Sequence, residues 1–120
     1  MMTLEDIKKD FDLVNAIDWD MTPEEAVRLY LEWGCNWARG NYVIRSKDDV
    51  THYFVVNTWR EKPVIYFIRR NSEEAVELAK FGMPGELERE FMNTVGRHKG
   101  VYSVDGKVKS WLKRQLNYNA

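Results

Sequence analysis

The chain has 120 residues, of which 44% are apolar and 13% aromatic, and its net charge is −1. This composition excludes intrinsic disorder, and no apolar run approaches the ~20 residues that a membrane-spanning helix needs. We therefore expect a single domain over residues 1–120, large enough to bury a core without a disulfide or a structural metal.

Two further features bear on the compartment. The single cysteine, Cys35, cannot form an internal disulfide, which suits a reducing environment. Residues 1–6 contain no basic region followed by an apolar stretch, so we expect no secretory signal there. Together these features predict a cytoplasmic protein with no membrane partner.

The first third of the chain has the patterns of two helices. Residues 3–6 resemble a capping box, and apolar residues follow it at helical spacing: Leu4, Ile7, Phe11 and Val14. A second helix, over residues 22–39, begins with Thr22 as its cap and Pro23 in its first position. Its polar stripe is narrow, which predicts that this helix is mostly buried.

The middle third is predicted to be a three-stranded antiparallel meander. Residues 41–45, 50–59 and 64–70 are rich in β-branched and aromatic residues, and four-residue loops separate them. With Trp59 placed opposite Val64, one face of this sheet is an apolar core face: Val43, His52, Phe54, Val56, Ile65 and Phe67. The other face is apolar in bulk but ends in hydroxyl, amide and indole groups: Tyr42, Ile44, Tyr53, Val55, Asn57, Trp59, Tyr66 and Ile68.

The last third returns to helix. Capping residues at 71–74 predict a short helix that ends at Gly82, and Pro84 opens another that ends at Gly96. Residues 107–116 predict a third helix, whereas residues 101–104 fit either a loop or a short fourth strand. The predicted fold is a single α+β domain with two N-terminal helices, a three-stranded antiparallel meander and two to three C-terminal helices, packed mainly on the apolar core face.

Charge alternates along the chain in four blocks. Residues 1–32 and 73–92 carry net charges of −6 and −4, whereas residues 33–72 and 93–120 carry +4 and +5. One interpretation is that the blocks are solvated faces and complements to helix ends. The other is that the sheet and the C-terminal segment form a basic surface for an anionic partner.

The polar-tipped sheet face is the first candidate site. Aromatic side chains beside arginine and lysine are typical of surfaces that bind single-stranded nucleic acid, but the aromatic-glycine signature of the RNA-recognition motif is absent and the pI is near 6.1. The alternatives are a face covered by helices and a face that docks a protein or a small ligand. The residues predicted to bind a partner are Tyr42, Tyr53, Trp59, Arg60, Lys62, Tyr66 and Arg70.

A basic loop between two glycines is the second, weaker candidate. Arg97, His98 and Lys99 lie between Gly96 and Gly100, where flexible backbone and cations suit a phosphate or carboxylate. The segment lacks the glycine spacing of a phosphate-binding loop and follows a helix rather than opening one. The alternative is a helix C-cap followed by a solvated basic turn.

Catalytic and metal-binding patterns are not found. His52, His98 and Cys35 share no ligand spacing, and Cys35 lies between two tryptophans, where apolar surroundings raise the pKa of a thiol. No catalytic motif occurs. We therefore expect no catalytic residue, no metal and no cofactor.

The function predicted from the sequence is a non-enzymatic binding or regulatory domain that docks a protein partner through its aromatic and basic sheet face. One alternative is a small anion- or metabolite-binding protein, or an enzyme, that uses Arg97, His98 and Lys99. The other is a single-stranded nucleic-acid binder. A homodimer is compatible with each of these.

Overall fold

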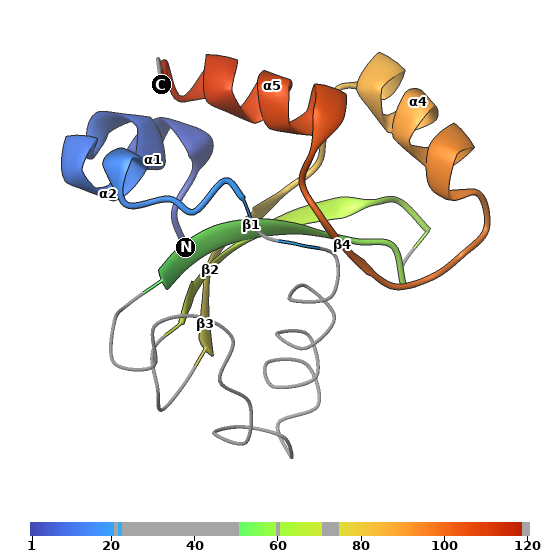
Figure 1. The fold of residues 1–120 in the computed structure, drawn as a ribbon, viewed down its shortest axis with the longest axis horizontal. Coiled ribbons are helices and arrows are strands. Elements are labelled where there is room, and N and C mark those ends of the chain that lie inside the picture. The colour runs from blue at the N-terminus through green and yellow to red at the C-terminus, as the bar shows by residue number, and fades with distance from the viewer. Residues whose placement is uncertain (21, 23–50, 60, 71–74, 119–120) are drawn as a thin grey trace.

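The computed structural model describes residues 1–20, 22, 51–59, 61–70 and 75–118, which form an α+β fold. The described strands are β1 (Thr51–Asn57), β2 (Val64–Arg70), β3 (Ala75–Phe81) and β4 (Val101–Ser103). The described helices are α1 (Leu4–Lys9), α2 (Phe11–Asn15), α4 (Gly85–Val95) and α5 (Gly106–Gln115). These helices lie on the same side of the sheet (Figure 1).

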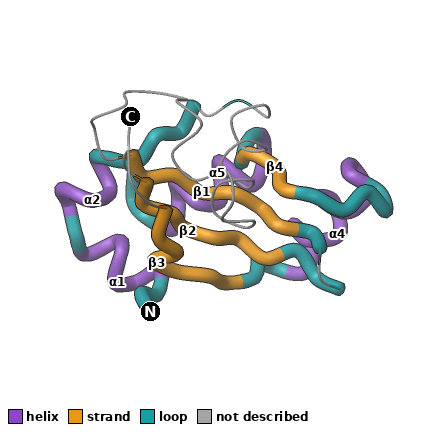
Figure 2. The backbone as a smooth tube through the Cα atoms, turned by 90° about the horizontal axis from the view of Figure 1, so that it is seen from below, coloured by secondary structure: helices purple, strands orange, loops and turns teal. Residues whose placement is uncertain are grey.

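The sheet formed by the described residues has four antiparallel strands in the order β3-β2-β1-β4 (Figure 2). β1 and β2 form the predicted hairpin, and β4 is the short fourth strand that was one alternative for residues 101–104. The described sheet differs from the predicted meander, because β1 also pairs with β4 and β2 also pairs with β3. The strand predicted at 41–45 and the helix predicted at 22–39 lie outside the described residues.

The prediction of a helix up to Gly82 was wrong for the part that the structure describes. Residues Ala75–Phe81 form β3, which pairs with β2 along its length, for example Phe67 with Ala79. β2 has buried side chains on both faces, so an unpaired edge here would leave its backbone groups without hydrogen bonds. Pairing of a whole strand outweighs a helical spacing of apolar residues, which is a weak preference.

The hairpin register differs from the predicted one by two residues. Asn57, rather than Trp59, lies opposite Val64. The strand ends at Asn57 because its side-chain Oδ1 accepts a hydrogen bond from the backbone N–H of Trp59 at 2.9 Å, which turns the chain away from β2. A shift of two residues keeps every side chain on its predicted face, so the predicted core face is confirmed for Phe54, Val56, Ile65 and Phe67. His52, predicted on the same face, is only half-buried, and Val43 lies outside the described residues.

The N-terminal helix is two short helices rather than one. The predicted capping box at Thr3 is present, with the Asp6 N–H donating to Thr3 Oγ1 at 3.2 Å and the Thr3 N–H donating to Asp6 Oδ2 at 2.9 Å. Asp10 then ends α1 and caps α2 by accepting a hydrogen bond from the Leu13 N–H at 3.1 Å. This break turns Phe11 outward, where it is 78% exposed, although its spacing from Leu4, Ile7 and Val14 fits one face of a single helix.

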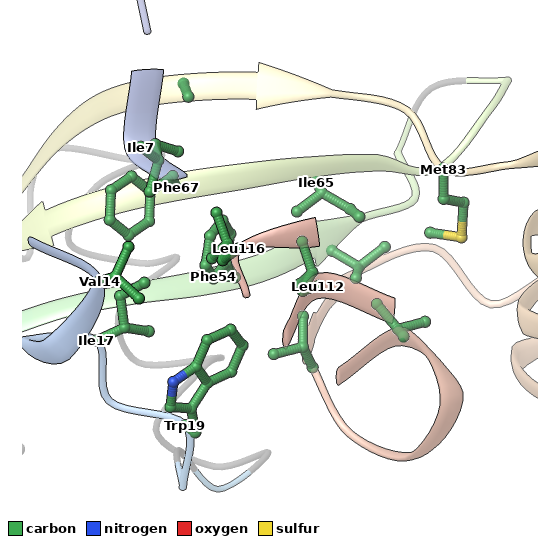
Figure 3. Packing of buried hydrophobic residues seen from close by; sticks show 14 residues of the cluster. Ile7, Val14, Ile17, Trp19, Phe54, Ile65, Phe67, Met83, Leu112 and Leu116 are labelled. Carbon is green, nitrogen blue, oxygen red and sulfur yellow. The ribbon is translucent and has the colours of Figure 1, made fainter. Parts of the chain in front are cut away.

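The core lies between the sheet and the helices. It consists of stacked aromatic rings and aliphatic side chains (Figure 3): Ile7, Val14, Ile17, Trp19, Phe54, Val56, Ile65, Phe67, Ala79, Met83, Val104, Val108, Leu112 and Leu116. The Phe54 and Phe67 rings stack with centroids 4.6 Å apart. α4 and α5 lie where the sequence predicted helices, and Gly96 ends α4 with φ 65°, a conformation that favours glycine. Within the described ranges, no helix is long and apolar enough to cross a membrane.

Candidate binding surface

Thr58 joins the β1–β2 hairpin to the loop that follows α4. Its backbone N–H donates to the Gly100 carbonyl at 2.9 Å, and its hydroxyl donates to the His98 carbonyl at 3.1 Å. The same hydroxyl oxygen accepts a hydrogen bond from the Gly100 N–H at 3.0 Å. Thr58 is buried, so these bonds are shielded from water and hold the two segments side by side (Figure 1).

This arrangement brings together parts of both candidate sites that the sequence predicted separately. Trp59 and Lys62 belong to the first site, and Arg97, His98 and Lys99 form the second. Trp59 is 50% exposed, and the other four residues are also exposed. We call these five residues the hairpin–loop surface. It combines an indole ring with three cationic side chains, while Glu61 adds one exposed carboxylate to the hairpin.

A groove of about 970 Å³ adjoins the hairpin–loop surface. It lies between α4, residues 98–105 and the first turn of α5, and its apolar walls are Leu87, Phe91, Val95, Tyr102 and Val108. The Phe91 and Tyr102 rings meet edge to face at 5.8 Å. The Lys107 ammonium bridges the groove to the Glu90 carboxylate, 3.0 Å from Oε1 and 2.9 Å from Oε2, so these two charges neutralise each other.

His98 belongs to both the groove and the hairpin–loop surface. Its side chain lines the groove, and its carbonyl accepts hydrogen bonds from the Thr58 hydroxyl and, at 3.0 Å, from the Tyr102 hydroxyl. The position of the basic loop is therefore fixed from the hairpin on one side and from β4 on the other. A ligand that contacts the hairpin–loop surface is next to the groove.

The opposite face of the sheet does not present its tyrosines to solvent. Tyr53 is 1% exposed and Tyr66 is 8% exposed, and the Arg70 side chain is also buried, at 7%. These three residues of the predicted partner-binding set are therefore buried rather than open to solvent. Tyr42 and Arg60 lie outside the described residues.

His52, on β1, has a perturbed pKa. Burial, and secondly the positive charge of Arg69, lower its pKa from the ordinary value of 6.5. Its Nδ1 is buried and has no hydrogen-bond partner in the part of the chain that the structure describes, and its ring stacks on Phe67 with centroids 6.0 Å apart. Among the described residues, no group of three or more His, Cys, Asp and Glu side chains is placed to hold a metal ion.

The sequence did not indicate two parts of this site. Thr58 has no local signal, because its partners are His98 and Gly100, forty and forty-two residues further along the chain. The groove had a partial signal in Leu87, Phe91 and Val95, which are spaced on one face of a helix. No family model matches the chain, and neither a curated protein nor a solved structure matches it significantly.

Proposed function

We propose that the protein is a non-enzymatic binding domain that docks an acidic protein partner through the hairpin–loop surface. The observation that carries the proposal is the set of Thr58 hydrogen bonds, which fix an exposed tryptophan and an exposed basic loop side by side. Tryptophan and arginine dominate the binding energy of protein interfaces. A surface already held in place loses little conformational entropy when it binds.

The charges of the surface favour an acidic partner. Lys62, Arg97 and Lys99 are exposed cations, and none of them forms an ion pair within the described residues that would neutralise it. Such a cluster raises the rate at which an oppositely charged partner associates, and salt weakens this effect. The indole ring of Trp59 then supplies apolar contact area once the partner has arrived.

The test is a binding assay with a designed peptide. A short fluorescein-labelled peptide, rich in Glu with a central Phe-Leu pair, is compared by fluorescence anisotropy with a version in which Lys replaces Glu. The proposal expects the Glu-rich peptide to bind more tightly, and Lys62→Glu/Lys99→Glu to weaken that binding at least about tenfold. The matched control is Lys8→Glu/Lys9→Glu, which makes the same charge change on exposed residues of α1.

Three results would contradict this function. The first is that neither peptide binds, and the second is that the Lys-rich peptide binds as tightly as the Glu-rich one. The third is that the two charge-reversal variants weaken binding equally, because only net charge would then matter. Single-stranded DNA that binds with a steep salt dependence and displaces the peptide would instead favour the nucleic-acid alternative.

A small-anion site is the second candidate function, and one observation favours it. His98, in the middle of the basic loop, lines a groove whose volume is in the range of small-molecule sites. Thermal-shift measurements with phosphate, sulfate and a set of metabolite carboxylates test this candidate function. A specific ligand stabilises the folded state by RT ln(1 + [L]/Kd), so the melting temperature rises with ligand concentration.

A further inference from the structure

The groove beside the hairpin–loop surface is built to receive an apolar side chain. Aliphatic and aromatic residues of α4, β4 and α5 form its apolar walls, beside polar lining residues such as Asn93, Thr94 and Ser103. None of the α4 residues is fully buried. The charges on its walls are largely offset, since Lys107 pairs with Glu90 and leaves Asp105 as the remaining carboxylate. An uncharged, bulky side chain gains most from such a site, because it removes apolar surface from water on both partners.

The cations at the loop end of the groove determine which residues of a ligand can flank that apolar side chain. Arg97 and Lys99 are the sequence neighbours of His98, which lines the groove, and both are exposed. The groove therefore offers an apolar site whose loop end is positively charged. The complementary ligand carries a bulky apolar residue next to carboxylates.

We propose that the groove binds a leucine or phenylalanine side chain of the same acidic segment that the hairpin–loop surface docks. This inference rests on the proposed function and adds the identity of the binding motif: an acidic linear segment with an apolar anchor. The carboxylates contact Arg97 and Lys99, and the anchor lies against Phe91, Tyr102 and Val108.

The experiment fills the groove without removing a core side chain. Thr94 is exposed on α4 and lines the groove, and its hydroxyl donates to the Glu90 carbonyl at 3.0 Å. Thr94→Trp places an indole ring in the groove. Ser110→Trp is the matched control, because Ser110 is exposed on α5 outside the groove and its hydroxyl donates to the carbonyl four residues earlier, at Gly106, at 3.1 Å.

Both variants are titrated with the Glu-rich Phe-Leu peptide and with the same peptide carrying Ser-Ser in place of Phe-Leu. The expected result is that Thr94→Trp and the Ser-Ser peptide each lose about tenfold or more in affinity, while Ser110→Trp binds as the parent does. Circular dichroism and the melting temperature establish that each variant is folded.

The remaining outcomes separate this inference from the proposed function. If Lys62→Glu/Lys99→Glu weakens binding but Thr94→Trp and the Ser-Ser peptide do not, the anchor site is overturned and the acidic docking function stands. If Thr94→Trp weakens binding and charge reversal does not, both proposals are overturned. Self-association that Thr94→Trp abolishes would also overturn the inference, since a second copy of the chain would then occupy the groove.

Discussion

The two ends of the helical layer differ in how completely they bury their apolar side chains. At one end, Leu112 of α5 and the C-cap residue Leu116 pack against the sheet at 0% and 2% exposure, beside Trp19 and Phe54. At the other end, α4 has no fully buried residue, although it has a similar length and a similar apolar stripe. Two helices with similar sequence patterns therefore have different roles. α5 completes the core at what we call the closed end of the layer. α4 leaves apolar surface open beside an exposed tryptophan and a basic loop, and we call this the open end.

The largest expected effect is on stability, and it tests the difference in burial between α5 and α4. Leu112→Ala should lower the free energy of unfolding by about 2–5 kcal/mol, because it leaves a cavity in a fully packed region. Leu87→Ala, on α4, should cost less than about 2 kcal/mol, since that side chain is only partly buried. Urea unfolding followed by circular dichroism measures both. Equal losses would show that α4 is as much a part of the core as α5.

The second prediction concerns the open end alone. Trp59→Ala should weaken binding of the Glu-rich Phe-Leu peptide by about 2 kcal/mol or more, because an indole ring at the centre of an interface is a frequent hot spot. The free energy of unfolding should change by no more than about 0.5 kcal/mol, since Trp59 is 50% exposed. Anisotropy titration and urea unfolding give the two values. A large loss of stability with unchanged binding would place Trp59 in the structure rather than in the interface.

The helices at both ends could be predicted from the sequence because their signals are local. α4 and α5 each have apolar residues at helical spacing, and Gly96 stops α4 in the conformation that glycine favours. The same holds for the Thr3 capping box and for the two faces of the β1–β2 hairpin. What distinguishes α4 from α5, however, is how much of the rest of the chain packs on each, and this has no local signal.

The errors arose where pairing or packing with other segments, rather than local spacing, decides the structure. The apolar residues of Ala75–Phe81 have a spacing that fits a helix, yet this segment forms β3 because it pairs with the edge of β2. The hydroxyl of Thr58 binds backbone groups about forty residues away, so the joining of the two candidate sites was invisible in the sequence. The burial of Tyr53 and Tyr66 likewise has no local signal, since it depends on what covers that face of the sheet.

The third prediction is a pH dependence that belongs to the closed end. His52 accepts a hydrogen bond through its carbonyl from the Asp18 N–H at 2.7 Å, and burial lowers the pKa of its imidazole from 6.5. As the pH falls through 6.5, the unfolded chain takes up a proton while the folded chain resists it. The free energy of unfolding should therefore decrease below that pH, until the pH reaches the lower pKa of the folded state.

One substitution isolates this effect. His52→Asn should flatten the dependence of the unfolding free energy on pH between about 5.5 and 7.5, with the parent and the variant each compared with its own value at the higher pH. A pH dependence in His52→Asn as steep as that of the parent would contradict the prediction, because another group would then be responsible.

The smallest expected effect concerns the ion pair between Lys107 of α5 and Glu90 of α4, and it shows what holds α4 in place. The Lys107 and Glu90 side chains are 75% and 53% exposed, so water screens their attraction even though the closest nitrogen–oxygen distance is 2.9 Å. A double-mutant cycle of Lys107→Ala and Glu90→Ala should give a coupling energy below about 1 kcal/mol, and added salt should reduce it further. Such a value would mean that α4 is held mainly by its half-buried Leu87, Phe91 and Val95, the same side chains that line the groove. A coupling energy well above that limit would mean that the ion pair fixes the width of the groove. Ionic strength would then alter the site itself as well as the approach of an acidic partner.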